Sequence, residues 1–206
     1  MIITLVGYMG TGKSHISNIL SSKLNFKLFD LDQEISNKFE LSIAEIFKNH
    51  GEIFFRKAEK ETLNEILSSE ESVILSVGGG TPVYYDNMER INDKSISIYL
   101  RTGVSTLTER LKKNKQKRPL IAKIADEDLP EFIAKHLFER NPFYSKAHYI
   151  VDTDQKTTEE VAEEIIQKYQ NHPKCLNERK VLPILSNQKM NEYLKEISDF
   201  CEIGFD

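Results

Sequence analysis

Residues 1–20 read MIITLVGYMGTGKSHISNIL, an apolar run that gives way to a glycine-rich loop, a lysine and a serine. The continuous apolar run from Ile2 to Val6 predicts a strand covered on both faces, and the apolar residues after Ser14 recur at helical spacing. The loop between them, from Gly7 to Ser14, fits the pattern GxxxxGK[ST]. Because it lies between a strand and a helix, this pattern indicates a phosphate-binding loop.

Each residue type in the loop has a physical reason. Glycines lack Cβ atoms, so the backbone N–H groups can turn inward around a β-phosphate, and the positive end of the next helix adds to the attraction. We expect Lys13 to reach the β- and γ-phosphates and the Ser14 hydroxyl to bind Mg²⁺. The expected nucleotide-binding residues of the loop are Gly10, Thr11, Gly12, Lys13, Ser14 and His15.

Phosphate loops occur in switches as well as in kinases. A GTPase would need a DxxG motif and an NKxD motif, and the chain has neither. The nearest approach to the guanine-binding motif is Asn114-Lys-Gln-Lys117, which lacks the acid that reads the base. A small-molecule or nucleotide kinase is therefore the leading class.

Strand-like runs alternate with helical patterns along the chain. Further strands are predicted over 26–31, 73–77, 96–100 and 149–151, with helical spacing between them. A capping-box signature at Ser42 opens a short helix, and a longer one follows over 52–67. This order predicts an α/β three-layer sandwich with a central parallel sheet of about five strands, whose ligands lie beyond the carboxyl ends of the strands.

Composition limits the class of protein further. Of the 206 residues, 39% are hydrophobic, which is enough to form a core. The net charge of -4 argues against a surface that coats nucleic acid. Cys175 and Cys201 show no CxxC spacing, so a zinc site or disulfide framework is not expected. No run is long and apolar enough for a membrane span. We expect a cytoplasmic protein without nucleic-acid or membrane partners.

The stretch FDLDQEI places Asp30 and Asp32 at the end of the second predicted strand. Two residues apart on an extended chain, their side chains would share one face, near the γ-phosphate. One carboxylate can hold the water shell of Mg²⁺, and the other can orient a substrate hydroxyl and accept its proton. The alternative is that Asp32 caps a helix and Asp30 is solvated.

The stretch HGEIFFRKAEKE allows two interpretations of its arginine. We expect Phe54, Phe55 and Ala58 to face the core. Arg56 could then be a surface charge over that core, or its planar fork could bind a carboxylate substrate. Three glycines, Gly78 to Gly80, follow the third predicted strand. Because glycines weaken a strand, this run indicates that a ligand comes close to the backbone there.

The segments that carry a family resemblance are GYMGTGKS, FDLDQEI, GEIFFRKAE, SVGGGTPV, KRPL and ERNPFYSKAHYIVDT. In this order they resemble the shikimate kinase family, which has the nucleoside-monophosphate-kinase-like P-loop fold. The resemblance covers residues 1–170. It implies transfer of the γ-phosphate of ATP to the 3-hydroxyl of shikimate, in the chorismate pathway to aromatic amino acids, with Mg²⁺ as cofactor.

The resemblance also implies roles for individual residues. Asp32 corresponds to the base that binds the substrate hydroxyls, and Asp30 to the residue near Mg²⁺. Arg56 and Arg140 correspond to the pair that binds the shikimate carboxylate, and Glu59 to a residue that steadies Arg56. The remaining residues of that pocket are Gly78, Gly79 and Gly80.

The same resemblance implies a substrate-binding segment over 31–60 and a lid over 114–126. Arg118 corresponds to a catalytic lid arginine that swings over the phosphates, although such a charge run is by itself usually a solvated loop. Arg110 corresponds to a residue that stacks on adenine. His15 departs from the family, which usually has a small hydroxyl residue there.

The end of the chain is the second departure, because residues 171–206 extend beyond the kinase-like part over 1–170. Met190, Tyr193, Leu194 and Ile197 form an amphipathic stripe, which predicts a helix. We expect a monomer, with a contact through this tail as the alternative. The functional alternatives are a gluconate or nucleotide kinase of the same fold, or a catalytically silent nucleotide-binding regulator.

Overall fold

The computed structural model describes residues 1–113, 115–117 and 120–176. Its centre is a five-stranded sheet in the order β2-β3-β1-β4-β5, and every neighbouring pair is parallel. The parallel sheet predicted from the alternating pattern is therefore confirmed. The strands are β1 (Ile2–Val6), β2 (Lys27–Asp30), β3 (Val73–Ser76), β4 (Ile96–Arg101) and β5 (Tyr149–Asp152).

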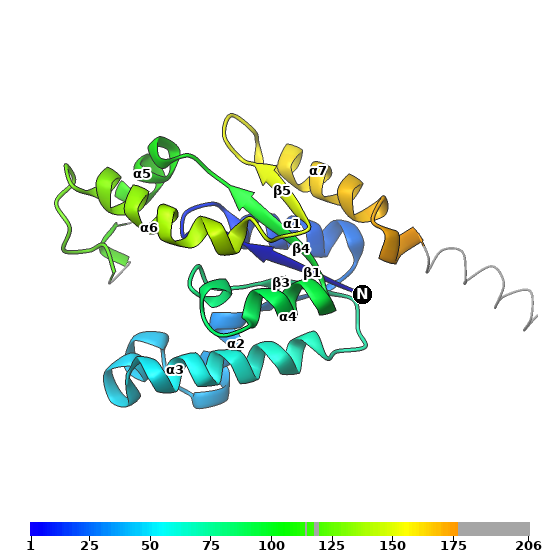
Figure 1. The fold of residues 1–206 in the computed structure, drawn as a ribbon, viewed down its shortest axis with the longest axis horizontal. Helices are drawn as coiled ribbons and strands as arrows, with labels where there is room; N and C mark the ends of the chain where they lie inside the picture. The colour runs from blue at the N-terminus through cyan, green and yellow to red at the C-terminus, as the bar shows by residue number, and fades with distance from the viewer. Residues whose placement is uncertain (114, 118–119, 177–206) are drawn as a thin grey trace, which may run out of the picture. The chain divides into compact units, whose positions relative to one another are not determined.

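Helices cover both faces of this sheet, which completes the three layers. In Figure 1, α1 lies behind the sheet, whereas α4 and α6 lie in front of it. The α-helices are α1 (Lys13–Leu24), α2 (Leu31–Phe39), α3 (Ile43–Leu67), α4 (Asn87–Lys94), α5 (Val104–Lys112), α6 (Leu129–Tyr144) and α7 (Thr158–Gln170). Two 3₁₀ turns, η1 (Thr81–Val83) and η2 (Lys115–Lys117), lie in the connections.

The core lies between the sheet and its helices. All residues of β1 and β3 are buried, as their continuous apolar sequence predicts for strands covered on both faces. Tyr99 of β4 and Ile133 of α6 belong to the same apolar cluster as Val6 of β1. Because all the strands are parallel, their carboxyl ends meet at one edge of the sheet.

The predicted second strand, 26–31, is too long. The strand β2 ends at Asp30 and α2 begins at Leu31, so Asp32 lies in the first turn of a helix. The expectation that both aspartates share one face of an extended strand is therefore wrong. The physical cause is a helix cap, because Oδ1 of Asp30 accepts the backbone N–H of Asp32 (3.1 Å) and of Gln33 (3.4 Å). The alternative interpretation, a cap at Asp32, is wrong as well.

The start of α3 agrees with the sequence prediction. The Ser42 hydroxyl oxygen accepts the N–H of Glu45 at 3.2 Å, and the Glu45 carboxylate accepts the N–H of Ser42 at 2.9 Å, which is a complete capping box. Gly51, with φ 80° and ψ 175°, interrupts the helical dihedrals. The two helices predicted for this region are thus the two halves of α3 around Gly51.

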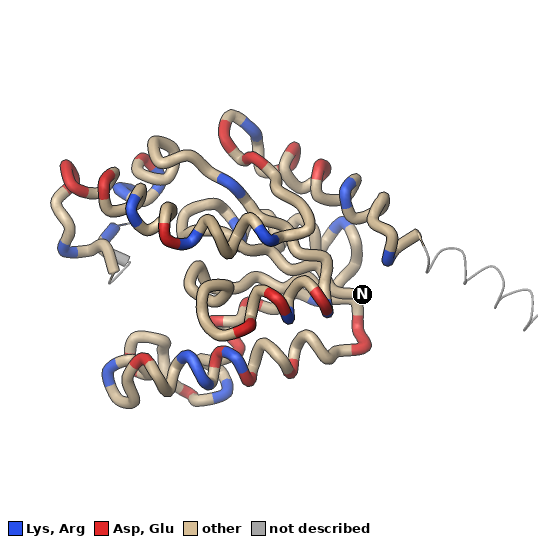
Figure 2. Tube along the Cα trace, in the orientation of Figure 1, with Lys and Arg blue, Asp and Glu red and all other residues tan. Residues whose placement is uncertain are grey.

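The core face of α3 differs from the prediction at one position. Phe55 and Ala58 are buried, as expected, but Phe54 is 36% exposed. Its ring stacks on His50 with 4.6 Å between the centroids, outside the apolar core. Figure 2 shows Lys and Arg mixed with Asp and Glu along α3 and α6, so neither helix carries charge of one sign.

The chain forms two compact units, Met1–Ile166 and the part from Gln167 onward. The second unit, where described, holds the end of α7 and a turn in which the N–H of Cys175 donates to the carbonyl of His172 at 2.9 Å. Within the described residues, no helix is both long and apolar enough to span a membrane. The amphipathic helix predicted around Met190 lies outside the described residues.

Candidate active site

The phosphate loop leaves β1 at the carboxyl edge of the sheet and enters α1. A Cβ atom on Gly7 would lie 2.8 Å from the carbonyl oxygen of Leu100, so only glycine fits there. Gly12 adopts φ 96° at the cap position of α1, and no side chain caps this helix. The positive, amino-terminal end of α1 therefore faces the adjoining cavity, where it would attract an anion.

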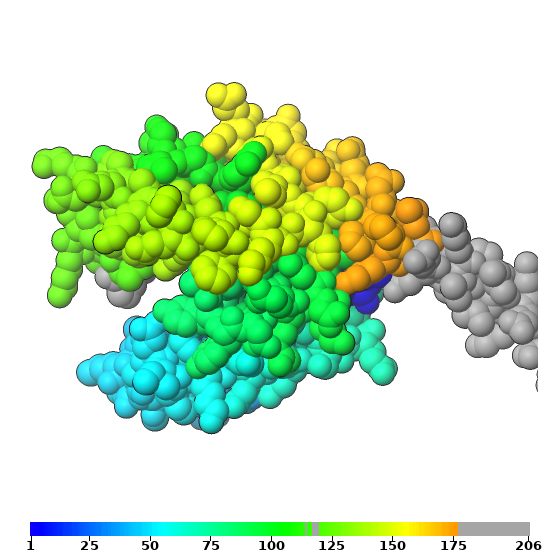
Figure 3. Space-filling model, viewed as in Figure 1, coloured from blue at the N-terminus to red at the C-terminus, as the bar shows by residue number. Residues whose placement is uncertain are grey.

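A cavity of about 580 Å³ opens at this edge, a size typical of small-ligand sites. Its wall includes the phosphate loop, the start of α2, the end of β3 and the loop before α7. None of the described residues that line this cavity belongs to α3 or α6, which lie on either side of a notch in the space-filling view of Figure 3. The cavity residues that the sequence predicted are Gly10, Thr11, Gly12, Lys13, Ser14, His15, Asp30, Asp32, Gly78, Gly79 and Arg110.

Two cations are held against the phosphate loop. Nζ of Lys13 donates to the carbonyl oxygens of Gly7 (2.7 Å) and Tyr8 (3.0 Å), which places the ammonium group across the loop. Nη1 of Arg110, from α5, donates to the carbonyl oxygens of Gly10 (3.3 Å) and Thr11 (3.4 Å). The structure thus brings Arg110, predicted from resemblance alone, to the predicted loop.

The triple glycine brings the predicted substrate residues together. A Cβ on Gly78 would lie 3.2 Å from Oδ1 of Asp32, and a Cβ on Gly80 would lie 3.1 Å from Nη1 and Nη2 of Arg56. A Cβ on Gly79 would lie 3.5 Å from Nη1 of Arg140. Each glycine is therefore approached by a different charged side chain, from α2, α3 and α6 respectively.

Asp32 lies in an environment that disfavours its charge. Burial raises the pKa of its carboxyl to about 6, and the neighbouring carboxylates of Asp30 and Glu59 act in the same direction. Lys13 and Arg56 oppose this rise, because they favour the ionised form. A carboxylate with a pKa near 6 is ionised at neutral pH and still basic enough to accept a proton.

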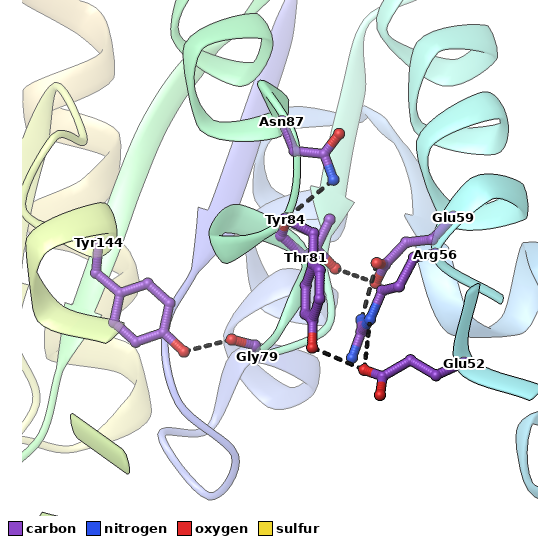
Figure 4. A network of polar contacts seen from close by, with 8 residues as sticks. All are labelled: Glu52, Arg56, Glu59, Gly79, Thr81, Tyr84, Asn87 and Tyr144. Carbon is purple, nitrogen blue, oxygen red and sulfur yellow. Dashed lines mark hydrogen bonds and ion pairs between the residues drawn. The ribbon is translucent and has the colours of Figure 1, made fainter. Parts of the chain in front are cut away.

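Glu59 anchors Arg56 from within α3. Its carboxylate is buried, accepts Nη1 of Arg56 at 2.9 Å and accepts the Thr81 hydroxyl at 2.6 Å (Figure 4). Nδ2 of Asn87 donates to the carbonyl oxygen of Thr81 at 2.9 Å. The guanidinium of Arg56 is thereby tied to the segment that follows the triple glycine. This arrangement excludes the interpretation of Arg56 as a surface charge only.

Arg140 is supported by two tyrosines that the sequence analysis missed. Its guanidinium lies 5.4 Å from the ring centre of Tyr8 in the phosphate loop. The Tyr144 hydroxyl donates to the carbonyl oxygen of Gly79 at 2.5 Å, as Figure 4 shows. Burial raises the pKa of Tyr8 to about 12 and also raises that of Tyr144, with Arg140 opposing both shifts. Both hydroxyls are therefore protonated at neutral pH.

The wall of the cavity also includes a loop that the sequence analysis did not predict. Thr153, Lys156 and Thr157 lie between β5 and α7, and Thr158 is the first residue of α7. All four line the cavity. A usable signal existed, because this segment directly follows a predicted strand and so lies at the same sheet edge.

The predicted lid, over 114–126, is only partly described. Arg118, its predicted catalytic residue, lies outside the described residues. Within the described part, Lys115 donates to Asp126 at 2.5 Å, which joins the two sides of the segment. The closing motion of this lid stays a prediction.

Comparison with known proteins places this chain in a family. The shikimate kinase family model matches residues 9–170. A shikimate kinase of Flavobacterium psychrophilum is 46% identical over 164 residues, which are 79% of this chain and 95% of that protein.

Two solved structures are similar as well. The shikimate kinase of Bacteroides thetaiotaomicron has a TM-score of 0.77 and 34% identity, covering 82% of this chain and 98% of that one. The shikimate kinase of Acinetobacter baumannii in complex with shikimate has a TM-score of 0.74 and 33% identity, covering 82% and 92%. With a matching family model over most of its length and close sequence relatives, this chain belongs to the shikimate kinase family.

Proposed function

We propose that this chain transfers the γ-phosphate of ATP to the 3-hydroxyl of shikimate, with Asp32 as the general base. The observation that carries the proposal is the triple glycine, where Asp32, Arg56 and Arg140 converge beside the phosphate loop. Two arginine forks suit a carboxylate, and a carboxylate base suits a hydroxyl. Shikimate carries both groups.

The reaction follows from this placement. The hydroxyl oxygen attacks the γ-phosphorus, the new O–P bond forms as the bond to the β-phosphate oxygen breaks, and the proton passes to Asp32. Lys13 stabilises the charge that develops on the transferring group and on ADP. Arg56 and Arg140 hold the substrate carboxylate, so that binding energy orients the hydroxyl. Arg110 and the loop before α7 contribute the wall around the nucleotide.

The residues present suit Mg²⁺. Ser14 and Asp30 line the same cavity and offer hard oxygen donors. Within the described residues no group of three His, Cys, Asp or Glu side chains is placed to hold a metal ion, and Mg²⁺ in kinases is commonly bound by one or two protein oxygens together with substrate phosphates. Bound there, Mg²⁺ would neutralise charge on the β- and γ-phosphates.

The test is an ADP-release assay with purified chain, ATP and Mg²⁺, in which shikimate, gluconate and nucleoside monophosphates are compared. We expect the highest kcat/KM for shikimate, with a phosphorylated product of shikimate identified by mass spectrometry. A higher kcat/KM for gluconate or a nucleotide would overturn the substrate assignment. ATP binding without turnover of any acceptor would favour the silent regulator.

A further inference from the structure

Tyr84, which directly follows η1, makes two contacts beside Arg56 that the proposed reaction does not yet use. Its ring lies 3.9 Å from the guanidinium carbon of Arg56. Its hydroxyl donates to Oε1 of Glu52 at 2.7 Å, and the same oxygen accepts Nε of Arg56 at 3.3 Å. Figure 4 shows the Tyr84 hydroxyl and the Arg56 side chain both joined to Glu52, between α3 and the segment after the triple glycine.

These contacts fix the orientation of the guanidinium group. Arginine guanidinium groups stack on aromatic faces, so the Tyr84 ring restricts the Arg56 guanidinium to a position over its face. Glu52 engages Nε of the same guanidinium, and Glu59 engages Nη1. The Nη1 and Nη2 edge faces Gly80, where the substrate carboxylate is expected.

The Tyr84 hydroxyl also controls a competing charge. Glu52 is a second carboxylate next to the arginine that must bind the carboxylate of the substrate. The hydrogen bond from Tyr84, more than the charge of Arg56, holds the pKa of Glu52 below its ordinary value. Glu52 is thus an anion at neutral pH, and the Tyr84 hydroxyl keeps it at the Nε edge, away from the edge that faces Gly80.

We propose that Tyr84 and Glu52 form a clasp that positions Arg56 for the substrate carboxylate and so determines the affinity for an acidic substrate. The inference rests on the proposed function. Tyr84 and Glu52 are positioning residues here, because they act on substrate through Arg56. A merely structural bridge between α3 and η1 would instead affect stability and leave the KM for shikimate unchanged.

The test compares single and double variants in steady-state kinetics. Tyr84→Leu should raise the KM for shikimate roughly three- to thirtyfold, because it removes the cation–π contact. Tyr84→Phe, which keeps the ring and the fold, should raise it roughly two- to fivefold through loss of the hydrogen bond. In both variants the KM for ATP and the kcat at saturating shikimate should stay within about twofold of the original chain.

Tyr85 provides the matched control. It is the next residue, is 55% exposed, and its ring contacts Lys60 instead of Arg56. Tyr85→Phe should leave the KM for shikimate unchanged. An equal rise in Tyr84→Phe and Tyr85→Phe would reject a role specific to Tyr84.

A double-mutant cycle tests whether the two residues act as one device. If they do, the KM for shikimate of the double variant, Tyr84→Phe with Glu52→Ala, should lie within about twofold of that of the more impaired single variant. If the two residues act independently, the two fold-changes in KM should multiply. Multiplying effects, or an unchanged KM for shikimate in Tyr84→Phe and Tyr84→Leu, would overturn the clasp while the proposed function survives. An original chain that fails to phosphorylate shikimate would reject the proposed function and the clasp with it.

Discussion

Asp32 is pulled in opposite directions by its surroundings. Burial and the nearby acids Asp30 and Glu59 raise the pKa of its carboxyl, while Lys13 and Arg56 lower it, with a result of about 6. These four neighbours come from the phosphate loop, the start of α2 and α3. The basicity of Asp32 is therefore a property of how these elements are packed, and it has a consequence for the pH dependence of the reaction.

Asp32 should determine the acid limb of the pH profile. A base must be ionised to accept a proton, so kcat/KM for shikimate should fall as the pH drops through about 6. Asp32→Asn should lower kcat by roughly a hundredfold or more and remove this limb, while ATP affinity stays nearly intact. Kinetics from pH 5 to 9, with ATP binding measured by calorimetry, would check both parts. A variant with the same kcat or the same limb would remove Asp32 as the base.

Arg56 and Arg140 should each need their planar fork. Lysine keeps the charge but makes no bidentate contact with a carboxylate. Arg56→Lys and Arg140→Lys should each cost about 1.5–3 kcal/mol of transition-state binding, or roughly ten- to a hundredfold in kcat/KM for shikimate. The KM for ATP, measured in the same assay, serves as the internal control. If both variants keep the original kcat/KM for shikimate, the assignment of a carboxylate-binding pocket is wrong, although the assignment as a kinase would still hold.

The site residues differ in how well the sequence alone predicts their position. Lys13 and Ser14 belong to a motif with fixed local spacing, so the motif alone predicted their place. Tyr144 carries no such signal, because its hydrogen bond to Gly79 joins positions 65 residues apart. Tyr84 and Glu52, 32 residues apart, meet only because α3 packs against η1. Contacts of this kind depend on tertiary packing, which one sequence does not reveal.

Among the elements, the junction of β2 and α2 is the most informative. The apolar pattern of FDLDQEI continues across it, and this continuity led to a predicted strand that is too long. Asp30 determines whether the chain continues as β2 or begins α2, because its side chain accepts two backbone N–H groups at the start of α2. The same carboxyl group lines the cavity, so one side chain has both a structural and a proposed metal-binding role.

The two roles of Asp30 can be separated by substitution. Asparagine is as good a helix cap as aspartate, whereas alanine is a poor one. Asp30→Asn should therefore change the free energy of unfolding by less than about 0.5 kcal/mol, while Asp30→Ala should lower it by about 1 kcal/mol. Both should reduce kcat and raise the Mg²⁺ concentration needed for half-maximal rate, because both remove the carboxylate charge.

Chemical denaturation and Mg²⁺ titration of the initial rate would check this separation. An Asp30→Asn variant with full activity and an unchanged Mg²⁺ requirement would leave Asp30 as a cap only. If Asp30→Asn lowered the free energy of unfolding as much as Asp30→Ala does, the capping role would be contradicted. The Ser42 capping box offers a comparison, because Ser42→Ala should lower stability without a change in the Mg²⁺ requirement.

Across the whole chain, alternation of strands and helices was enough to predict a parallel sheet, because parallel neighbours need crossover connections. The strand order β2-β3-β1-β4-β5 was not predicted. The order depends on which strands pair with each other. Because β1, β3 and β4 have similar apolar sequences, the sequence does not show which of them are neighbours. The site residues nevertheless gather, since every parallel strand delivers its carboxyl end to the same edge, whatever the order.

The last prediction concerns the end of the chain. Every residue assigned here to the site and placed by the structure lies before α7 or in its first turns, and the family model ends at residue 170. A chain that ends at Leu176 should therefore keep kcat and both KM values within about twofold, since it keeps every site residue that the structure places. Steady-state kinetics and thermal unfolding of the two chains, side by side, would check this. A loss of more than about tenfold in kcat/KM for either substrate would mean that residues 177–206 contribute to the site.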